Sequence, residues 1–190
     1  MVGADPSFTD VHLLRALLIL HTGVMGRKRL VKRLGVGEGS VRTIIKRLTY
    51  SGYLDSSKLG HSLTKKGASE AESKLKKMSK PAAFDSEGLV DGYQSLIVLY
   101  GAADKIGGEV ALRDCALKAG ADGAVILVKQ GGLRFPGGGL ELDNYPPAKE
   151  KLEKSGLAEG DAAVIGFSKN SYAKAEDGAV AVTLEILPKQ

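Results

Sequence analysis

The chain has 190 residues, of which 43% are hydrophobic and 26% charged, a composition typical of globular domains. Its net charge of +5 is unevenly distributed, because residues 1–80 hold 16 Lys or Arg against 6 Asp or Glu, whereas residues 81–190 hold 11 against 16. The single cysteine, Cys115, excludes a disulfide within the chain, and the longest apolar run, 13–20, is interrupted by Arg15 and too short to span a membrane. No apolar signal segment opens the chain, so we expect a cytoplasmic protein that does not enter membranes.

Helical periodicity dominates the first half of the chain. Apolar residues recur at helical spacing over 11–18 and predict a first helix, which either Ser7 or Thr9 can cap. The basic stretch 27–34 is a shorter amphipathic segment, and it stops at Gly35-Val36-Gly37. A further amphipathic segment follows this short glycine-containing turn, so the pattern predicts a helix-turn-helix.

The segment 37–51 predicts the second helix of that pair. Val41, Ile44, Ile45 and Leu48 share one narrow face, while Thr43, Lys46 and Tyr50 centre the opposite face with Arg42 and Arg47 beside it. An apolar stripe opposite a cationic face, in the basic half of a chain, is typical of a recognition helix that binds a nucleic acid. We therefore predict that this helix enters the major groove of duplex DNA.

A hairpin and another helix complete the predicted first domain. Gly52-Tyr53-Leu54 and His61-Ser62-Leu63 bracket the polar, glycine-containing segment 55–60, which favours a two-stranded hairpin. In a winged helix-turn-helix domain this hairpin would be the wing. Thr64 can cap the following helix, which we expect to run to about Met78.

The second half predicts a separate domain. A change of charge sign and Pro81 mark a break without regular structure at 80–88, so we expect one domain over 1–80 and another over 88–190. Predicted strands at 93–100, 124–129, 133–135 and 162–167 alternate with helices at 109–118 and 147–154 in the order βαββαβ. This order predicts an α+β class with a two-layer, ferredoxin-like or related sheet. Alternating valines after Gly178 favour one more strand at the end.

No catalytic motif is evident in the second half, but a few residues are candidates for binding a ligand. They are Asp104, Lys105, Arg113, Gly137, Gly138 and Gly139. The glycines lack the Lys-Ser/Thr ending of a phosphate loop, so they form either an anion-binding loop or an ordinary one. The charged residues form either a polar ligand cluster or solvated ion pairs. No spacing typical of a metal site or a catalytic triad is present, so we expect no metal, no cofactor and no enzymatic activity.

Several short motifs together resemble one archaeal family. They are Gly26 to Leu30, Glu38 to Ile44 and Leu63 to Gly67 in the first half, and Gly101 to Ile106, Arg113-Asp114 and Gly120-Ala121 in the second. Members of this family pair a winged-helix domain with a C-terminal domain of unknown function, which is similar in fold to the GAD domain of some tRNA synthetases and amidotransferases. The resemblance covers nearly the whole chain. It implies a transcriptional regulator, and it implies neither catalytic residues nor a particular ligand.

We expect a sequence-specific regulator that binds double-stranded DNA as a homodimer. The side chains expected to contact DNA are Lys28, Ser40, Arg42, Thr43, Lys46, Arg47, Lys58 and His61. Those on the recognition helix would contact base edges and phosphates, whereas those on the preceding helix and the wing would hold the DNA backbone. The second domain would dimerise the chain, bind a small-molecule effector, or do both.

Two alternative functions are compatible with the sequence. In one, the second half is a small-molecule kinase or transferase, and the winged helix is a regulatory appendage. In the other, the chain is an interaction module that binds protein or RNA. Such a module would prefer structured RNA to duplex DNA, because A-form RNA hides its major groove from a helix.

Overall fold

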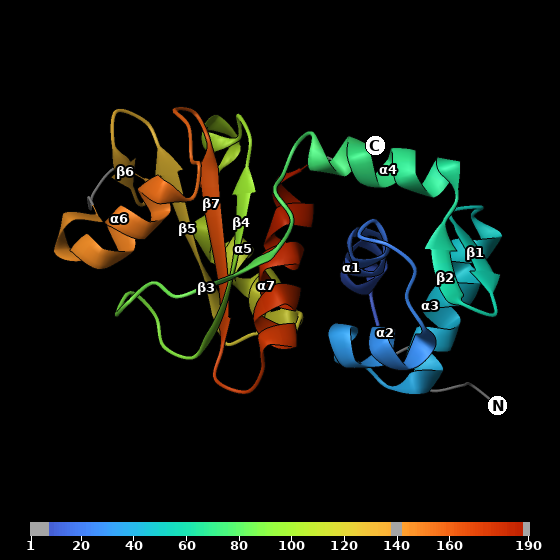
Figure 1. Cartoon of the computed structure of the whole chain (residues 1–190). Coiled ribbons are helices and arrows are strands. Elements are labelled where there is room, and N and C mark those ends of the chain that lie inside the picture. The colour runs from blue at the N-terminus through green and yellow to red at the C-terminus, as the bar shows by residue number, and fades with distance from the viewer. Residues whose placement is uncertain (1–7, 138–141, 188–190) are drawn as a thin grey trace. The chain divides into compact units, whose positions relative to one another are not determined.

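The computed structural model describes residues 8–137 and 142–187, and the chain divides into two compact units (Figure 1). The first unit runs to Leu75, and the second begins at Lys76. Within the described ranges, no helix is both long enough and apolar enough to cross a bilayer.

The first unit consists of three helices, a hairpin and a fourth helix. These elements are α1 (Asp10–Leu20), α2 (Arg27–Leu34), α3 (Glu38–Tyr50), β1 (Leu54–Ser57), β2 (Gly60–Leu63) and α4 (Lys65–Leu75). The sequence predicted each of them in this order. The last helix ends at Leu75, a few residues before the predicted end.

An apolar cluster holds these elements together. Its buried members are Phe8, Ala16, Leu17, Ile19, Leu20, Leu30, Leu34, Val41, Ile44, Leu48, Leu54 and Ala71. Burying one leucine or isoleucine side chain stabilises a fold by about 1.5–3 kcal/mol. Because isolated helices as short as α2 are marginal in water, this packing, rather than helix propensity, orders the unit.

The second unit contains a sheet flanked by helices. Its strands are β3 (Ala82–Phe84), β4 (Tyr93–Leu99), β5 (Gly123–Lys129), β6 (Leu133–Arg134) and β7 (Ala162–Ser168). Its helices are α5 (Glu109–Lys118), α6 (Pro146–Lys154) and α7 (Tyr172–Ile186), with short 3-10 turns at Ala103–Lys105 and Leu142–Asn144. The predicted βαββαβ order is confirmed by β4, α5, β5, β6, α6 and β7, and so is the α+β class.

The strands lie in the order β3-β4-β7-β5-β6, and every neighbouring pair is antiparallel. The last strand of the βαββαβ pattern, β7, therefore lies between the first two, β4 and β5. In a ferredoxin-like sheet the third strand of the pattern takes that place. The ferredoxin-like part of the prediction is therefore wrong in its strand order.

Helices cover both faces of this sheet, so the unit has three layers and not the two predicted (Figure 1). On one face, Leu96 and Val98 of β4 pack in an apolar cluster with Leu152 of α6. On the other face, α7 lies so close to β7 that a Cβ added to Gly166 would stand 2.2 Å from the carbonyl oxygen of Ala175. The consecutive apolar residues of the central strands follow from this arrangement, because a strand covered on both faces needs no polar alternation.

The predicted last strand is wrong, because helix α7 occupies its residues. Ser171 caps the start of the helix by accepting a hydrogen bond from the backbone N–H of Lys174 (3.3 Å). Ala175, Ala179 and Ile186 recur at helical spacing and are buried. The alternating valines fit a strand equally well, but packing against β4, β7 and α5 selects the helix.

The segment predicted to be an irregular break contains the short edge strand β3, which pairs with β4. Just before it, the backbone N–H of Ser79 donates a hydrogen bond to the carbonyl oxygen of Val98 (2.8 Å). A strand of three residues shows no alternation that a sequence pattern can reveal. Pro81, which cannot donate to a ladder, is compatible with this edge position.

Candidate nucleic-acid interface

The α2–turn–α3 pair is fixed by its turn and by a buried arginine. Gly35 ends α2 in the left-handed conformation (φ 70°), which glycine adopts without a steric penalty. The Arg15 guanidinium, from α1, donates hydrogen bonds to the carbonyl oxygens of Leu34 (3.0 Å) and Arg33 (2.9 Å). Arg15 is only 1% exposed, and its positive charge lies at the carboxyl end of α2, where the helix dipole favours a cation.

Helix α3 divides into a buried and an exposed face, as its sequence predicts. Val41, Ile44 and Leu48 are buried in the core of the first unit. Five of the exposed side chains, here named the α3 face, are Arg42, Thr43, Lys46, Arg47 and Tyr50. Because the core contacts fix the rotation of the helix about its axis, the α3 face presents three cations and a phenol ring together.

Glu38 stands at the amino end of the α3 face and pairs with two arginines. One carboxylate oxygen lies 3.1 Å from the Arg27 guanidinium and 3.8 Å from that of Arg42. The Arg42 side chain is 70% exposed, and exposed ion pairs contribute about 0–1 kcal/mol. The pairing therefore orients Arg42 without holding it firmly, and a phosphate or a guanine edge can replace Glu38 as its partner.

Two more of the predicted contact residues on α3, Thr43 and Arg47, also have partners within the unit. The Thr43 hydroxyl donates a hydrogen bond to the carbonyl oxygen of Gly39 (3.1 Å), one turn earlier in α3. The Arg47 guanidinium lies 4.9 Å from the centre of the Phe8 ring. An exposed cation–π contact contributes about 0.5–1 kcal/mol, so Arg47 is held near the start of the described chain.

A hollow of about 740 Å³ lies on the α3 face. Its lining consists of Leu13, Thr43, Lys46, Arg47, Thr49, Tyr50 and Ser51. The Tyr50 ring is 94% exposed, which is a large apolar surface to leave in water. Tyrosine and arginine are enriched at binding interfaces, so this part of the α3 face has the composition of a surface that a partner covers.

The hairpin lies next to the start of α2. Met25 and His61 exchange two backbone hydrogen bonds of 2.9 Å, so the residues before α2 extend the hairpin by one more strand-like segment. The His61 ring lies 2.8 Å from the Ser56 hydroxyl, measured at Nδ1, and Lys58 is exposed at the hairpin turn. Partial burial, and secondarily the charge of Arg27, lower the pKa of His61. The ring is therefore neutral at neutral pH, and Lys58 carries the positive charge of the hairpin.

The remaining two predicted contacts lie in the first turns of their helices. Lys28 is the second residue of α2 and is exposed, and Ser40 is the third residue of α3 and is half-buried. The first turn of a helix has open backbone N–H groups and a partial positive charge, which suit a phosphate. All eight predicted contacts thus belong to α2, α3 or the hairpin.

The ligand residues predicted in the second unit lie in different places. Asp104, in a 3-10 turn, accepts a hydrogen bond from the Gln130 side chain (2.5 Å). Arg113, on α5, lines a hollow of about 250 Å³ with Phe135. Of the other candidates, Lys105 and Gly137 are exposed, and Gly138 and Gly139 lie outside the described residues. The described residues include no group of three or more His, Cys, Asp or Glu placed to hold a metal ion.

Two residues that shape the interface have only weak signals in the sequence. Arg15 interrupts an apolar helical run, and such an isolated charge indicates a buried cation with hydrogen-bond partners. Glu38 is favourable for the helix dipole, which explains its position without reference to Arg42. Its pairing across two helices becomes evident only when α2 and α3 are placed side by side.

The fold and this surface define a protein that joins a basic, helix-rich unit to an antiparallel sheet unit. Residues 90–186 match a domain of unknown function (DUF4443), and residues 11–69 match the PH0730-like N-terminal domain. The chain is also similar to the hypothetical protein PH0730 from Pyrococcus horikoshii OT3, with 30% identity and a TM-score of 0.79 over 95% of this chain and 93% of that one. Among curated proteins, none matches.

The chain therefore belongs to the DUF4443 family. The predicted resemblance is confirmed to this extent: the matches cover both halves of the chain, and the similar structure comes from an archaeon. The likeness of the second unit to a GAD domain and the role as a regulator stay predictions.

Proposed function

We propose that the chain is a transcriptional regulator that binds specific sites on double-stranded DNA through its first unit. The observation that carries the proposal is the α3 face, where exposed cations lie opposite a fully packed apolar stripe on the second helix of a helix-turn-helix pair. Cationic surfaces of this kind attract the phosphates of duplex DNA and bring an exposed helix to the major groove.

In this proposal, each part of the surface has its own role. Arg42 and Lys46 contact base edges in the major groove, where arginine and lysine pair with guanine. Lys28 and Lys58 neutralise phosphates on either side, so that α2 and the hairpin, acting as a wing, set the position of the unit on the duplex. Arg47 releases the Phe8 ring when it binds a phosphate.

The assembly is proposed to be a homodimer. Two copies of the first unit would then contact half-sites about 34–36 Å apart, one turn of the duplex. The second unit would hold the two copies together, bind an effector, or do both. The molecular mass in solution, measured with and without a bound duplex, tests this part of the proposal.

A salt-titrated binding assay with genomic duplex fragments tests the DNA-binding proposal. Unrelated duplex and tRNA serve as competitors, and wild type is compared with an Arg42→Ala/Lys46→Ala variant. A matched control, Lys118→Ala/Lys169→Ala, removes the same charge from exposed positions of the second unit. Each lost bidentate base contact should reduce discrimination between sites by about 1–3 kcal/mol.

We expect the α3 variant to lose selective duplex binding while the control variant keeps it. If the two variants lose the same affinity, only net charge matters, and the recognition role of α3 is refuted. If tRNA competes better than the unrelated duplex, the partner is structured RNA instead.

A further inference from the structure

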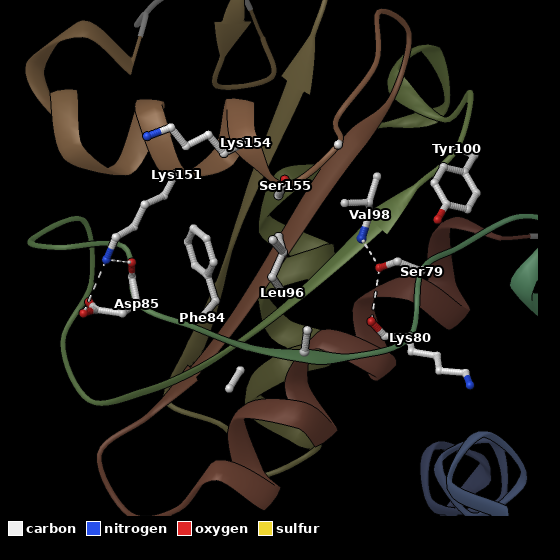
Figure 2. Close-up of a pocket in the computed structure, with 13 residues that line it drawn as sticks. Ser79, Lys80, Phe84, Asp85, Leu96, Val98, Tyr100, Lys151, Lys154 and Ser155 are labelled. Atoms are coloured by element: carbon white, nitrogen blue, oxygen red, sulfur yellow. Dashed lines mark hydrogen bonds and ion pairs between the residues drawn. The ribbon is translucent and has the colours of Figure 1, made fainter. Parts of the chain in front are cut away.

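A cavity of about 710 Å³ opens in the second unit, on the same face of the sheet as α6 (Figure 2). Leu96 and Val98 of β4 form its floor, and the Phe84 and Tyr100 rings stand beside them in the close-up. Leu96 and Val98 belong to the apolar cluster of this face and Phe84 packs against it, so the floor is continuous with the core. The volume is within the range of about 300–1,000 Å³ typical of small-molecule sites.

Lysines of α6 form one side of this cavity. Lys151 is held by acidic partners, since its ammonium lies 2.5 Å from a Glu87 carboxylate oxygen and 3.6 Å from one of Asp85. Lys154 pairs only with its helix neighbour Glu150 among the ion pairs of the described residues, and its side chain is 72% exposed. An exposed pair one turn apart contributes about 0.3–0.5 kcal/mol, so Lys154 can exchange Glu150 for another anion.

We propose that this cavity binds a small carboxylate with an aromatic body. The ring of the ligand lies on Leu96 and Val98 next to Phe84, whose ring favours a stacked or edge-to-face contact. Its carboxylate pairs with Lys154 at the rim. The combination of an apolar floor with movable cations at its edge, Lys154 and also Lys80, matches the composition of ligand sites, where a few polar groups set orientation and apolar side chains supply affinity.

The opposite wall of the cavity is the segment that enters the second unit from α4. The Ser79 hydroxyl accepts a hydrogen bond from the backbone N–H of Val98 (2.9 Å), and Ser79 and Lys80 both line the cavity. A ligand in the cavity therefore contacts this segment and β4 at once and stabilises their pairing. Binding itself is independent of DNA, whereas a role for the ligand as an effector rests on the function proposed above.

The probes are 3-phenylpropionate and its neutral analogue 3-phenylpropan-1-ol, each titrated into the full chain by calorimetry. Ala82 lines the cavity beside Leu96, with which it pairs in the sheet, and it is exposed, so Ala82→Phe fills the cavity without disturbing a core. Ala111→Phe is the matched control, because Ala111 is also an exposed alanine of the second unit but belongs to α5 and does not line the cavity. Lys154→Gln and Glu150→Gln test the ion pair in opposite directions.

We expect saturable one-to-one binding of the acid, with the alcohol weaker by about threefold to fivefold, as an exposed ion pair predicts. Lys154→Gln should reduce the affinity for the acid to that for the alcohol, and Glu150→Gln should raise it. Ala82→Phe should weaken binding by at least about tenfold, the loss of roughly 1.4 kcal/mol of contact energy, and Ala111→Phe should leave it unchanged.

Absence of saturable binding of the acid at about 10 mM, where a site with even millimolar affinity would be filled, overturns the proposal. Equal binding by wild type and Ala82→Phe also overturns it, since the ligand would then lie elsewhere. Neither result depends on whether the first unit binds DNA. The calorimetry therefore tests the ligand site alone, and the DNA-binding assay tests the proposed function alone.

Discussion

The packing of α4 on the hairpin depends on one glycine, and the substitution Gly67→Ala tests it. A Cβ at position 67 would stand 2.0 Å from the carbonyl oxygen of Tyr53, where ordinary contacts begin at 3.4 Å. The obstacle is backbone, and the same Tyr53 carbonyl accepts a hydrogen bond from the N–H of Thr64 (3.0 Å), so it cannot turn away cheaply. Overpacking of this kind costs about 1–3 kcal/mol, and we expect the upper end because two backbone segments must separate.

Gly39→Ala is the matched control, since Gly39 also lies in the first turn of a helix and a Cβ there meets nothing within 4 Å. There, alanine should stabilise the unit by about 0.5–1 kcal/mol through its helix propensity. Both variants are measured in the full chain by urea unfolding, followed by circular dichroism, and by thermal unfolding. A loss of about 3 kcal/mol corresponds to a Tm lower by roughly 12–24 °C in a unit of this size. If Gly67→Ala unfolds like wild type, α4 does not pack against Tyr53 as described.

Three further substitutions test other parts of the chain. Gly166→Ala should destabilise the second unit by about 3 kcal/mol in urea unfolding, because the added methyl would meet the backbone of Ala175 on α7 at 2.2 Å. If the variant unfolds at the same urea concentration as wild type, α7 does not pack on β7 as described. Because the pKa of His61 is lowered in the folded chain, the unfolded chain binds the proton first as pH falls. The free energy of unfolding should therefore decrease below about pH 6.5. His61→Gln should reduce this pH dependence, as measured by unfolding curves at about pH 7.5 and pH 5. Lys58→Ala should weaken binding to all duplexes alike and reduce the salt slope by about 0.9, the value for one phosphate, and a change in site preference would show instead that Lys58 reads bases.

Much of the first unit is predictable because its signals are local. Helices α1, α2 and α3 each have their own apolar stripe, and Gly35 and Gly52 mark where helices stop. Short windows of sequence are therefore enough to predict each helix and its end. The rows of residues on the two faces of α3 follow from helical spacing alone. What local spacing cannot give is the partner of each side chain. Thr43 bonds to its own helix, Arg47 lies over Phe8, and Glu38 pairs with Arg27 of another helix.

The errors in the second unit come from signals that two structures share. Residues after Gly178 alternate in hydropathy, and the same residues also place apolar side chains on one side of a helix that begins at Tyr172. Contacts with residues far away in the chain decide between helix and strand. Gly166 leaves room for the α7 backbone at the surface of β7, and a strand at that position would have no sheet edge to join. Similarly, β3 is too short to show a period, and its place in the sheet comes from β4.

The cavity of the second unit is the case in which sequence patterns carry least information. Its wall, floor and rim come from Ser79, Leu96 and Lys154, which are far apart in the chain and unremarkable in their own windows. Glycine-rich loops attract attention in a sequence because their motif is contiguous, whereas a cavity assembled from a linker, a strand and the end of a helix has no contiguous motif. Its linker wall is also the covalent connection to the first unit, so a ligand that stabilises the pairing of Ser79 with β4 acts on the only segment through which the chain passes from one unit to the other.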